Sequence, residues 1–363
     1  MSCLIFTGII LTIAKNISQE RSVSSIYHLL VGSKNIQTIQ DAYIFGIQNY
    51  YGVYKGLEKS RFDEKIQELT QLGLLIEKAR ENSRKFMAYT EQADYWLSEH
   101  QQRLPLHYFQ GIVYEEKASL FYERLLLLIQ TLSNVKENNF NFIPVIHQSD
   151  AESFVRNVYN QKKANKNQYI QKLYEELVDL LEDLPEVEAN LFVDRLSGFG
   201  HYGKSIEQLE TTYNKSKDDV ILTLVGVSHQ FIRKIESEKN TYHVLFEMVA
   251  DLQTPSRLTD SARKTYELFL RDFTPEEIAH KRHLKLNTIY DHLAEIALYD
   301  SAFPFSSFVT ETEAEEIMHA IEHTESYKLK VIKDAVPSDI SFFQIRLMLV
   351  FKHKFREGGG QFV

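Results

Sequence analysis

The hydrophobic positions of the chain recur mostly at the three- to four-residue spacing of amphipathic helices. Near the N-terminus this pattern predicts helices over Ser22–Gly32, Thr38–Tyr50 and Ser60–Leu72. Two short apolar runs follow, Leu74–Glu77 and Phe86–Thr90, and the polar residues between them predict a β-hairpin. Three helices followed by a hairpin are the order of a winged-helix domain with a small wing.

The tip of the predicted hairpin is basic. Four cations face a single acid, Glu81, which gives a net charge of four minus one, or +3; the cations are Lys78, Arg80, Arg84 and Lys85. A positive wing suits contact with the phosphate backbone of DNA, which positions a protein without reading sequence. A solvated hairpin tip that binds nothing is the alternative, and the residues leave both open.

The most specific local pattern lies further on, over Thr274–Leu298, and it predicts a helix-turn-helix. Thr274 is a favourable N-cap, and Pro275 follows at the first helical position, where its missing N–H costs nothing. A second helix begins near Leu286, with inward apolar residues at helical spacing. The turn position that is usually Gly is His283, which we expect to adopt a positive φ at a cost of roughly 1 kcal/mol.

The outer side of this second helix holds the candidate base contacts. We expect it to expose Lys285, Asn287, Tyr290, Asp291 and Glu295. The candidate DNA-binding residues are Lys285, Asn287, Thr288 and Tyr290, whereas the two acids would face a polyanion unfavourably. Residues 257–300 hold seven basic and eight acidic residues, a net of seven minus eight, or −1. A domain that binds DNA by itself is usually basic, so a helix-turn-helix used for packing or docking stays open.

The region between these two patterns reads as helical. Leu104–Ser133 predicts a long helix, Asn134–Asn141 a polar boundary, and Ala151–Leu184 further helix interrupted by a solvated Lys162–Lys166 run. We therefore expect a mainly α protein of three modules. Their predicted bounds are 1–100 for the winged helix, 101–252 for a helical middle with a second helix-turn-helix-like unit near 185–235, and 256–363 for the C-terminal helix-turn-helix.

Gly198–Ser205 satisfies the letters of a phosphate-binding loop and of a dinucleotide fingerprint. That chemistry needs a buried strand before the loop, so that backbone N–H groups at a helix N-terminus can hold phosphates. The lead-in Glu188–Ser197 has helical character instead, and no βαβ alternation occurs in the sequence. We expect a turn in which Ser205 caps a helix, with nucleotide binding as an alternative.

Metal and catalytic patterns are weaker. Glu277-x-x-His280 and Glu316-x-x-His319 have the spacing of di-iron ligands, but the other carboxylates of such a site cannot be placed. Spacing nominates no catalytic Ser, Cys or His set. The sequence therefore predicts a non-enzyme without metal or cofactor.

The amino-acid composition indicates the cellular compartment and the kind of nucleic-acid contact to expect. In 363 residues the only cysteine is Cys3, so no disulfide can form within the chain, and a reducing cytoplasm fits. A net charge of −9 means that contact with nucleic acid must come from local patches. The apolar run Ser2–Ala14 lacks the flanks of a signal peptide and is too short to span a bilayer, so we expect a buried first element and no membrane association.

Three segments together resemble one family. They are Ser24-Ser-Ile-Tyr-His-Leu-Leu with Gln37-Thr-Ile-Gln-Asp-Ala, Arg195-Leu-Ser-Gly-Phe-Gly, and Thr288-Ile-Tyr-Asp-His-Leu-Ala-Glu. In these residues the chain resembles the YpbB-like family of Firmicutes, whose gene neighbours that of a RecQ-type helicase. Leu258–Val350 also resembles the helix-turn-helix module at the C-terminus of some RecQ helicases.

The resemblance implies an accessory protein of a RecQ-type DNA helicase in DNA repair or recombination. For such an adaptor we expect weak, backbone-directed DNA binding. Two hypotheses from the residues stand beside it: a helix-turn-helix transcription regulator that binds selected sequences, and a nucleotide-binding protein that uses Gly198–Ser205. The surface that meets the helicase, the preferred DNA structure and the oligomeric state are left open.

Overall fold

The computed structural model describes residues 3–17, 20–81, 84–252, 258–300 and 302–358. Helix α1 (Leu4–Ile17) is buried on most of its circumference, with Phe6, Ile9 and Ile10 fully covered. The predicted buried first element is thus confirmed. In the described part of the chain no helix has both the length and the apolar character needed to cross a membrane.

The N-terminal module follows the predicted order of elements. Its elements are α2 (Val23–Leu30), α3 (Ile36–Ile44), the short 3-10 helix η1 (Gln48–Tyr50), α4 (Lys59–Gln71), and the antiparallel strands β1 (Leu75–Glu81) and β2 (Arg84–Tyr89). The winged-helix assignment itself stays a prediction. The mainly helical fold class is confirmed, because the described residues form one two-stranded sheet among helices.

Two predicted boundaries in this module were wrong. The second helix does not reach Tyr50, because Gly46 adopts φ +64° just after Ile44 and ends it with a left-handed cap. The hairpin strands also run through most of the predicted tip, since Glu81 still pairs with Arg84. Polar side chains do not interrupt the two-stranded hairpin, because they can be exposed to solvent on its faces.

The middle module is helical throughout. After α5 (Glu91–His100), which ends the N-terminal module, its elements are η2 (Gln101–Arg103), η3 (Leu106–Tyr108), α6 (Gly111–Lys136), α7 (Ser149–Lys162), η4 (Lys163–Asn165), α8 (Lys166–Glu182), α9 (Glu186–Val193), α10 (Ile206–Tyr213), α11 (Lys217–Ser237) and α12 (His243–Glu247). The long helix begins at Gly111 rather than at Leu104. A Cβ on Gly111 would lie 2.0 Å from the carbonyl oxygen of Tyr51, so only glycine fits where α6 crosses this loop.

The C-terminal module holds the helix-turn-helix and five more elements. They are α13 (Asp260–Phe269), α14 (Pro275–Arg282), α15 (Leu286–Tyr299), η5 (Phe305–Ser307), α16 (Glu311–Thr324), α17 (Leu329–Asp334) and α18 (Phe342–Gly358).

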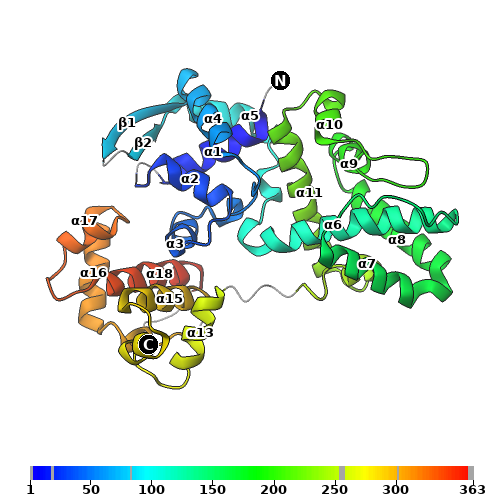
Figure 1. Ribbon diagram of the computed structural model, residues 1–363. Coiled ribbons are helices and arrows are strands. Elements are labelled where there is room, and N and C mark those ends of the chain that lie inside the picture. Colours follow the sequence, from blue (N-terminus) through cyan, green and yellow to red (C-terminus); the bar gives the residue numbers. More distant parts are fainter. Residues whose placement is uncertain (1–2, 18–19, 82–83, 253–257, 301, 359–363) are drawn as a thin grey trace.

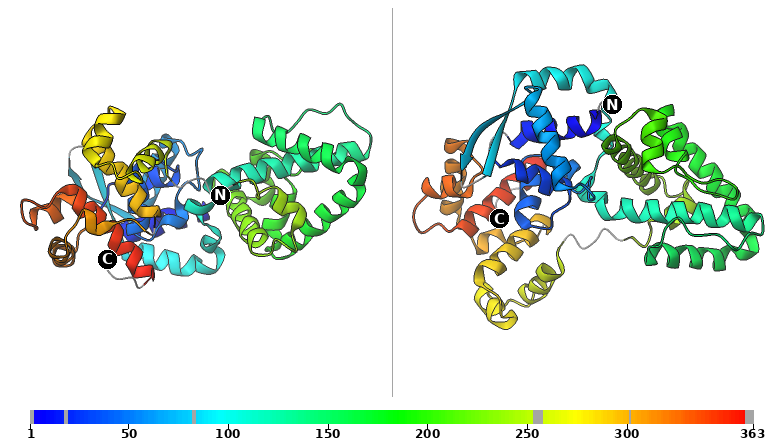
Figure 2. Two further views of the ribbon diagram at one scale, coloured as in Figure 1. Left: turned by 90° about the horizontal axis from the view of Figure 1, so that it is seen from below. Right: turned by 45° about the horizontal axis from the view of Figure 1, so that its top comes forward.

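The buried apolar residues form two clusters. One cluster combines the N-terminal module with the C-terminal module, and the other fills the middle module. Figures 1 and 2 show the same division, with the first and last parts of the chain on one side and α6–α12 on the other. Arg21 links the N-terminal module to the C-terminal module. Its guanidinium donates to Asp41 of α3 at 2.8 Å and to the carbonyl of Tyr327 at 3.2 Å.

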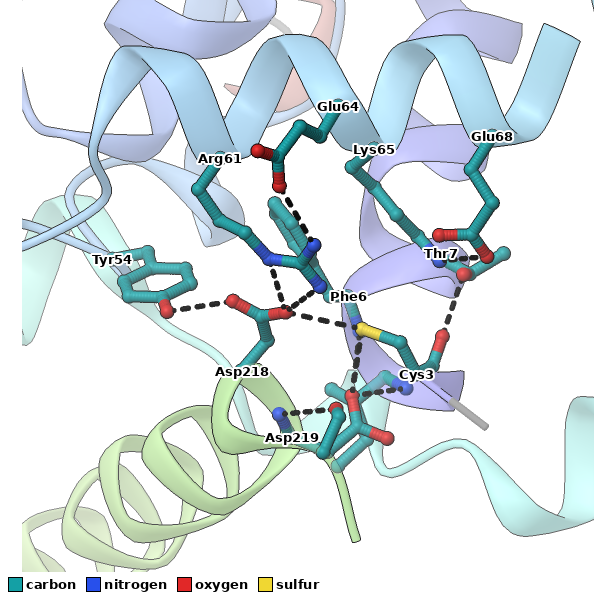
Figure 3. Close-up of polar contacts among 12 residues, drawn as sticks. Cys3, Phe6, Thr7, Tyr54, Arg61, Glu64, Lys65, Glu68, Asp218 and Asp219 are labelled. Atoms are coloured by element: carbon teal, nitrogen blue, oxygen red, sulfur yellow. Dashed lines mark hydrogen bonds and ion pairs between the residues drawn. The ribbon is translucent and has the colours of Figure 1, made fainter. Parts of the chain in front are cut away.

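A polar cluster at the start of α11 holds the middle module against the N-terminal one (Figure 3). The Asp219 carboxylate accepts the N–H groups of Leu4, Ile5 and Phe6 at 2.6–3.1 Å and so caps α1. Asp218 accepts from the hydroxyl of Tyr54 and from Arg61 of α4. The thiol of Cys3 lies against both acids, and burial together with the Asp219 charge raises its pKa, which keeps it protonated.

Candidate nucleic-acid interface

The helix-turn-helix has the local geometry that its sequence predicts. Thr274 and Glu277 form a reciprocal capping box at the start of α14, with Pro275 in the first turn. His283 ends the helix at φ +52°, as expected for the position usually held by Gly. Ile278 and Ala279 are buried.

The surroundings of α15 differ from those of a helix that reads DNA. From His292 to Leu298 every residue of α15 is buried. Helices α13, α14, α18 and α3 all pack against it. The second half of α15 is therefore covered by protein, and exposed side chains remain at its N-terminal turn, the part of a recognition helix that contacts base edges.

The four candidate residues of this motif separate into two groups. Lys285, the N-cap of α15, and Asn287 in its first turn are exposed, and Thr288 is half-buried. Tyr290 instead stacks on Phe343 of α18, with ring centroids 4.3 Å apart. Only the beginning of the helix is therefore open to a ligand.

The expected exposure of Glu295 on α15 was wrong, whereas the side chain of Asp291 is 45% exposed. Glu295 is 4% exposed, and its carboxylate accepts hydrogen bonds from the backbone N–H and the hydroxyl of Thr259 at the start of α13. Burial raises the pKa of Glu295, and the Thr259 hydrogen bonds oppose that shift. Asp291 forms an ion pair with Arg346 of α18. Both partners lie more than thirty residues away along the chain, where helical spacing gives no signal.

The hairpin places two of its four candidate cations in the open. Lys78 and Lys85 are exposed. The strand register is irregular between Glu77 and Ala79, so Lys78 is the unpaired residue of a bulge, a feature that commonly redirects a side chain. The backbones of Arg80 and Arg84 lie within the strands, but their side chains fall outside the described residues.

The Gly-rich segment forms a turn, as predicted. Helix α9 precedes it where a phosphate loop would need a strand, and Gly198 and His201 bridge to each other. Ser205 makes a capping box with Gln208 at the start of α10, which confirms its predicted role as N-cap. The ammonium of Lys204 forms an ion pair with Asp194 at 2.6 Å, so it is already neutralised within the turn.

Nowhere in the described ranges do three His, Cys, Asp or Glu side chains gather closely enough to hold an ion. The Glu-x-x-His pairs on α14 and α16 thus stand without the further ligands that a di-iron site requires.

Fold and site together define a helix-turn-helix protein, the class from which many DNA-binding proteins come. Residues 261–349 match the family model of a helix-turn-helix domain. Over 350 residues the chain is 27% identical to Protein YpbB of Bacillus subtilis (strain 168). The aligned residues make up 96% of this chain and 98% of that relative. The resemblance to the YpbB-like family expected from the sequence is thereby confirmed. No solved structure matches the chain.

Proposed function

We propose that this protein is a non-enzymatic DNA-binding adaptor that works with a RecQ-type helicase in DNA repair or recombination. The observation that carries the proposal is the covered recognition helix, α15. Sequence is read by side chains that reach base edges, whereas phosphate contacts position a protein on any sequence. With only Lys285 and Asn287 exposed on α15, the second mode is the one that the described surface supports.

The choice of partner rests on the resemblance. A family whose gene neighbours that of a RecQ-type helicase, and a C-terminal module similar to one carried by such helicases, favour an accessory protein of that enzyme. A helix-turn-helix that is packed into its own protein also fits a docking role. The site of action would be the cytoplasm, where bacterial DNA lies.

A transcription regulator would need an open recognition helix. Nucleotide binding through Gly198–Ser205 would need the free lysine of a phosphate loop, and Lys204 is paired with Asp194. No specific observation favours either the regulator or the nucleotide-binding protein. A regulator would show strong preference for one duplex sequence, and a nucleotide-binding protein would show saturable ATP binding that is lost in Lys204→Ala.

The first experiment is co-purification of the tagged protein from its native host, with nuclease-treated lysate as the control. We expect a RecQ-type helicase to be retained after nuclease treatment. Its absence from both preparations would overturn the proposed partnership. Recovery only without nuclease would place DNA, rather than a protein contact, between the two proteins.

A binding titration tests the DNA contact itself. Labelled duplexes of two unrelated sequences should bind with similar, strongly salt-dependent affinities. Arg80→Glu/Arg84→Glu in the hairpin should weaken binding, whereas the matched reversal Arg233→Glu/Lys239→Glu, at exposed positions at and just beyond the end of α11, should not. A strong preference for one sequence would favour the regulator.

A further inference from the structure

One stretch of the middle module departs sharply from the acidic character of the chain. Residues 153–174 hold five cations and seven Asn or Gln residues but no Asp or Glu, in a chain of net charge −9. The cations are Arg156, Lys162, Lys163, Lys166 and Lys172. The stretch spans the end of α7, the short helix η4 and the start of α8, and we refer to Arg156–Lys172 as the basic turn.

The fold sorts this stretch into an inner and an outer side. Val155 and Val158 of α7, and Tyr169 and Leu173 of α8, are buried in the core of the middle module. The exposed side chains that remain on the two helices are Ser153, Arg156, Asn157, Asn160, Gln161, Asn167, Gln168, Gln171, Lys172 and Tyr174. The outer surface near the turn is therefore made of cations, amides and hydroxyls.

Two of the five cations are held by the protein. Lys162 pairs with Glu247 at 2.7 Å, and Lys166 donates to the carbonyl of Val135 at the end of α6, at 3.3 Å. Arg156, Lys163 and Lys172 are exposed and have no carboxylate within 4.0 Å among the described residues. These three charges are available to an external anion.

Acidic side chains on the same two helices flank the basic turn on both sides. Asp150 and Glu152 begin α7, and the acids of α8 start at Glu175. Glu247 is the acid in contact with the turn, where it neutralises Lys162. An approaching polyanion would meet the exposed cation Lys163 at the centre of the turn, whereas Arg156 and Lys172 each have an acid, Glu152 and Glu175, within one helical turn.

The turn is also firmly placed. Arg124 of α6 is 2% exposed and donates to Asp150 at the start of α7, to Asp251 and to the carbonyl of Met248. This network holds the start of α7 against α6. The Lys166 contact holds the start of α8 against the last turn of α6. A ligand would therefore meet donors that are already ordered, which lowers the entropic cost of binding.

We propose that the basic turn binds the phosphodiester backbone of DNA and forms a second contact surface, separate from the β1–β2 hairpin. Lysine and arginine neutralise phosphates, and Asn and Gln side chains donate hydrogen bonds to phosphate and sugar oxygens. This inference rests on the proposed function, because it assigns one place where that DNA contact is made. Figure 1 shows α7 and α8 on the side of the molecule away from β1 and β2, so the two surfaces can be changed independently.

The test is the neutralising variant Lys163→Gln/Lys172→Gln in the full-length protein. Each phosphate contact contributes about 0.9 to the slope of log K against log salt, so losing two should lower the slope by about 1.8. Near 0.1 M salt the affinity for a labelled duplex should fall roughly tenfold or more. The matched control Arg233→Gln/Lys239→Gln removes the same charge from exposed positions near the end of α11 and should leave both quantities unchanged.

Three results would overturn the inference. If the turn variant keeps the original slope while Arg80→Glu/Arg84→Glu loses binding, the turn is not a contact, although the proposed function stands. If the control variant loses as much as the turn variant, the effect is one of overall charge. If the unmodified protein binds no duplex even at low salt, the inference and the proposed DNA contact fall together. Arg156→Gln is an independent check should the double variant melt at a lower temperature than the unmodified protein.

Discussion

The helix pair α14–α15 and the helix pair α7–α8 make opposite use of the same kind of structure. The first carries every local mark of a helix-turn-helix, yet its second helix lies inside the protein, beneath α18 and α3. The second pair carries no recognisable motif, yet residues 153–174, which join its two helices, present exposed cations and amides without an acid among them. A motif therefore describes how a segment folds, whereas exposure and charge decide which segment can meet a polyanion.

The difference has a physical origin in what covers each pair. Helix α15 is apolar or small over most of its circumference after Ile289, and burying that surface against several neighbours is favourable. Its one buried acid, Glu295, is satisfied by Thr259, so burial leaves no unpaired charge. The basic turn has no comparable apolar surface on its outer side, and its free cations keep it in water.

The largest expected effect comes from removing the cover of α15. Leu347 of α18 is fully buried in the same cluster as Ile289 and Leu293. Leu347→Ala should lower the free energy of unfolding by about 2–5 kcal/mol through lost burial and the resulting cavity. The control is Phe342→Ala at the start of the same helix, where the side chain is 51% exposed and little should change. Thermal unfolding measures both variants.

Local hydrogen exchange sharpens that result. In Leu347→Ala, amides of α15 should lose protection while those of α7 and α8 keep theirs, because the two pairs belong to separate clusters. Equal loss in both pairs would show that the molecule unfolds as one unit and would remove the basis for treating the regions separately.

A smaller effect is expected on acidification, and it should differ between the two regions. Burial lowers the pKa of His229 of α11, whose ring lies against Phe109 and Tyr114, to about 3. Burial, and then the Arg282 charge, also lower the pKa of His292 in α15. Both histidines bind a proton more readily when unfolded, near pH 6.5, so the stability they contribute is present above that pH and is lost as the pH falls.

For His229 the loss should reach about 2 kcal/mol between pH 6.5 and 5, since each unit of difference corresponds to about 1.36 kcal/mol. Hydrogen exchange at the two pH values should therefore show a larger loss of protection in α11 than in α15. His229→Asn, which keeps an acceptor for the N–H of Gln110, should flatten the dependence in α11. A dependence that persists in this variant would assign the acid sensitivity to other groups.

The smallest expected effect lies in the motif itself. Lys285→Ala/Asn287→Ala removes the exposed candidate contacts of α15, and we expect the affinity for duplex DNA to fall less than in Lys163→Gln/Lys172→Gln, because one cation is lost instead of two. The same titration that is used for the basic turn measures it. A loss larger than that of Lys163→Gln/Lys172→Gln would reverse the comparison and make the first turn of α15 the main DNA contact.

Much of the fold could be predicted where the signal was local. The Thr274 capping box, the left-handed His283, the Ser205 cap and the order of helices and hairpin all depend on neighbours within a few residues. Candidate contacts were predicted less well. Lys285 and Asn287 are exposed as expected, but Tyr290 stacks on Phe343 and Glu295 binds Thr259, and helical spacing cannot report either partner.

By itself, then, the sequence determined the helices, their caps, the hairpin and the absence of acids from residues 153–174, because these features depend on residue type and short-range spacing. Only the tertiary structure decided that α15 would be covered and the basic turn left open. The covering elements α18 and α3 lie far from α15 along the chain, and burial is fixed by which apolar faces find one another.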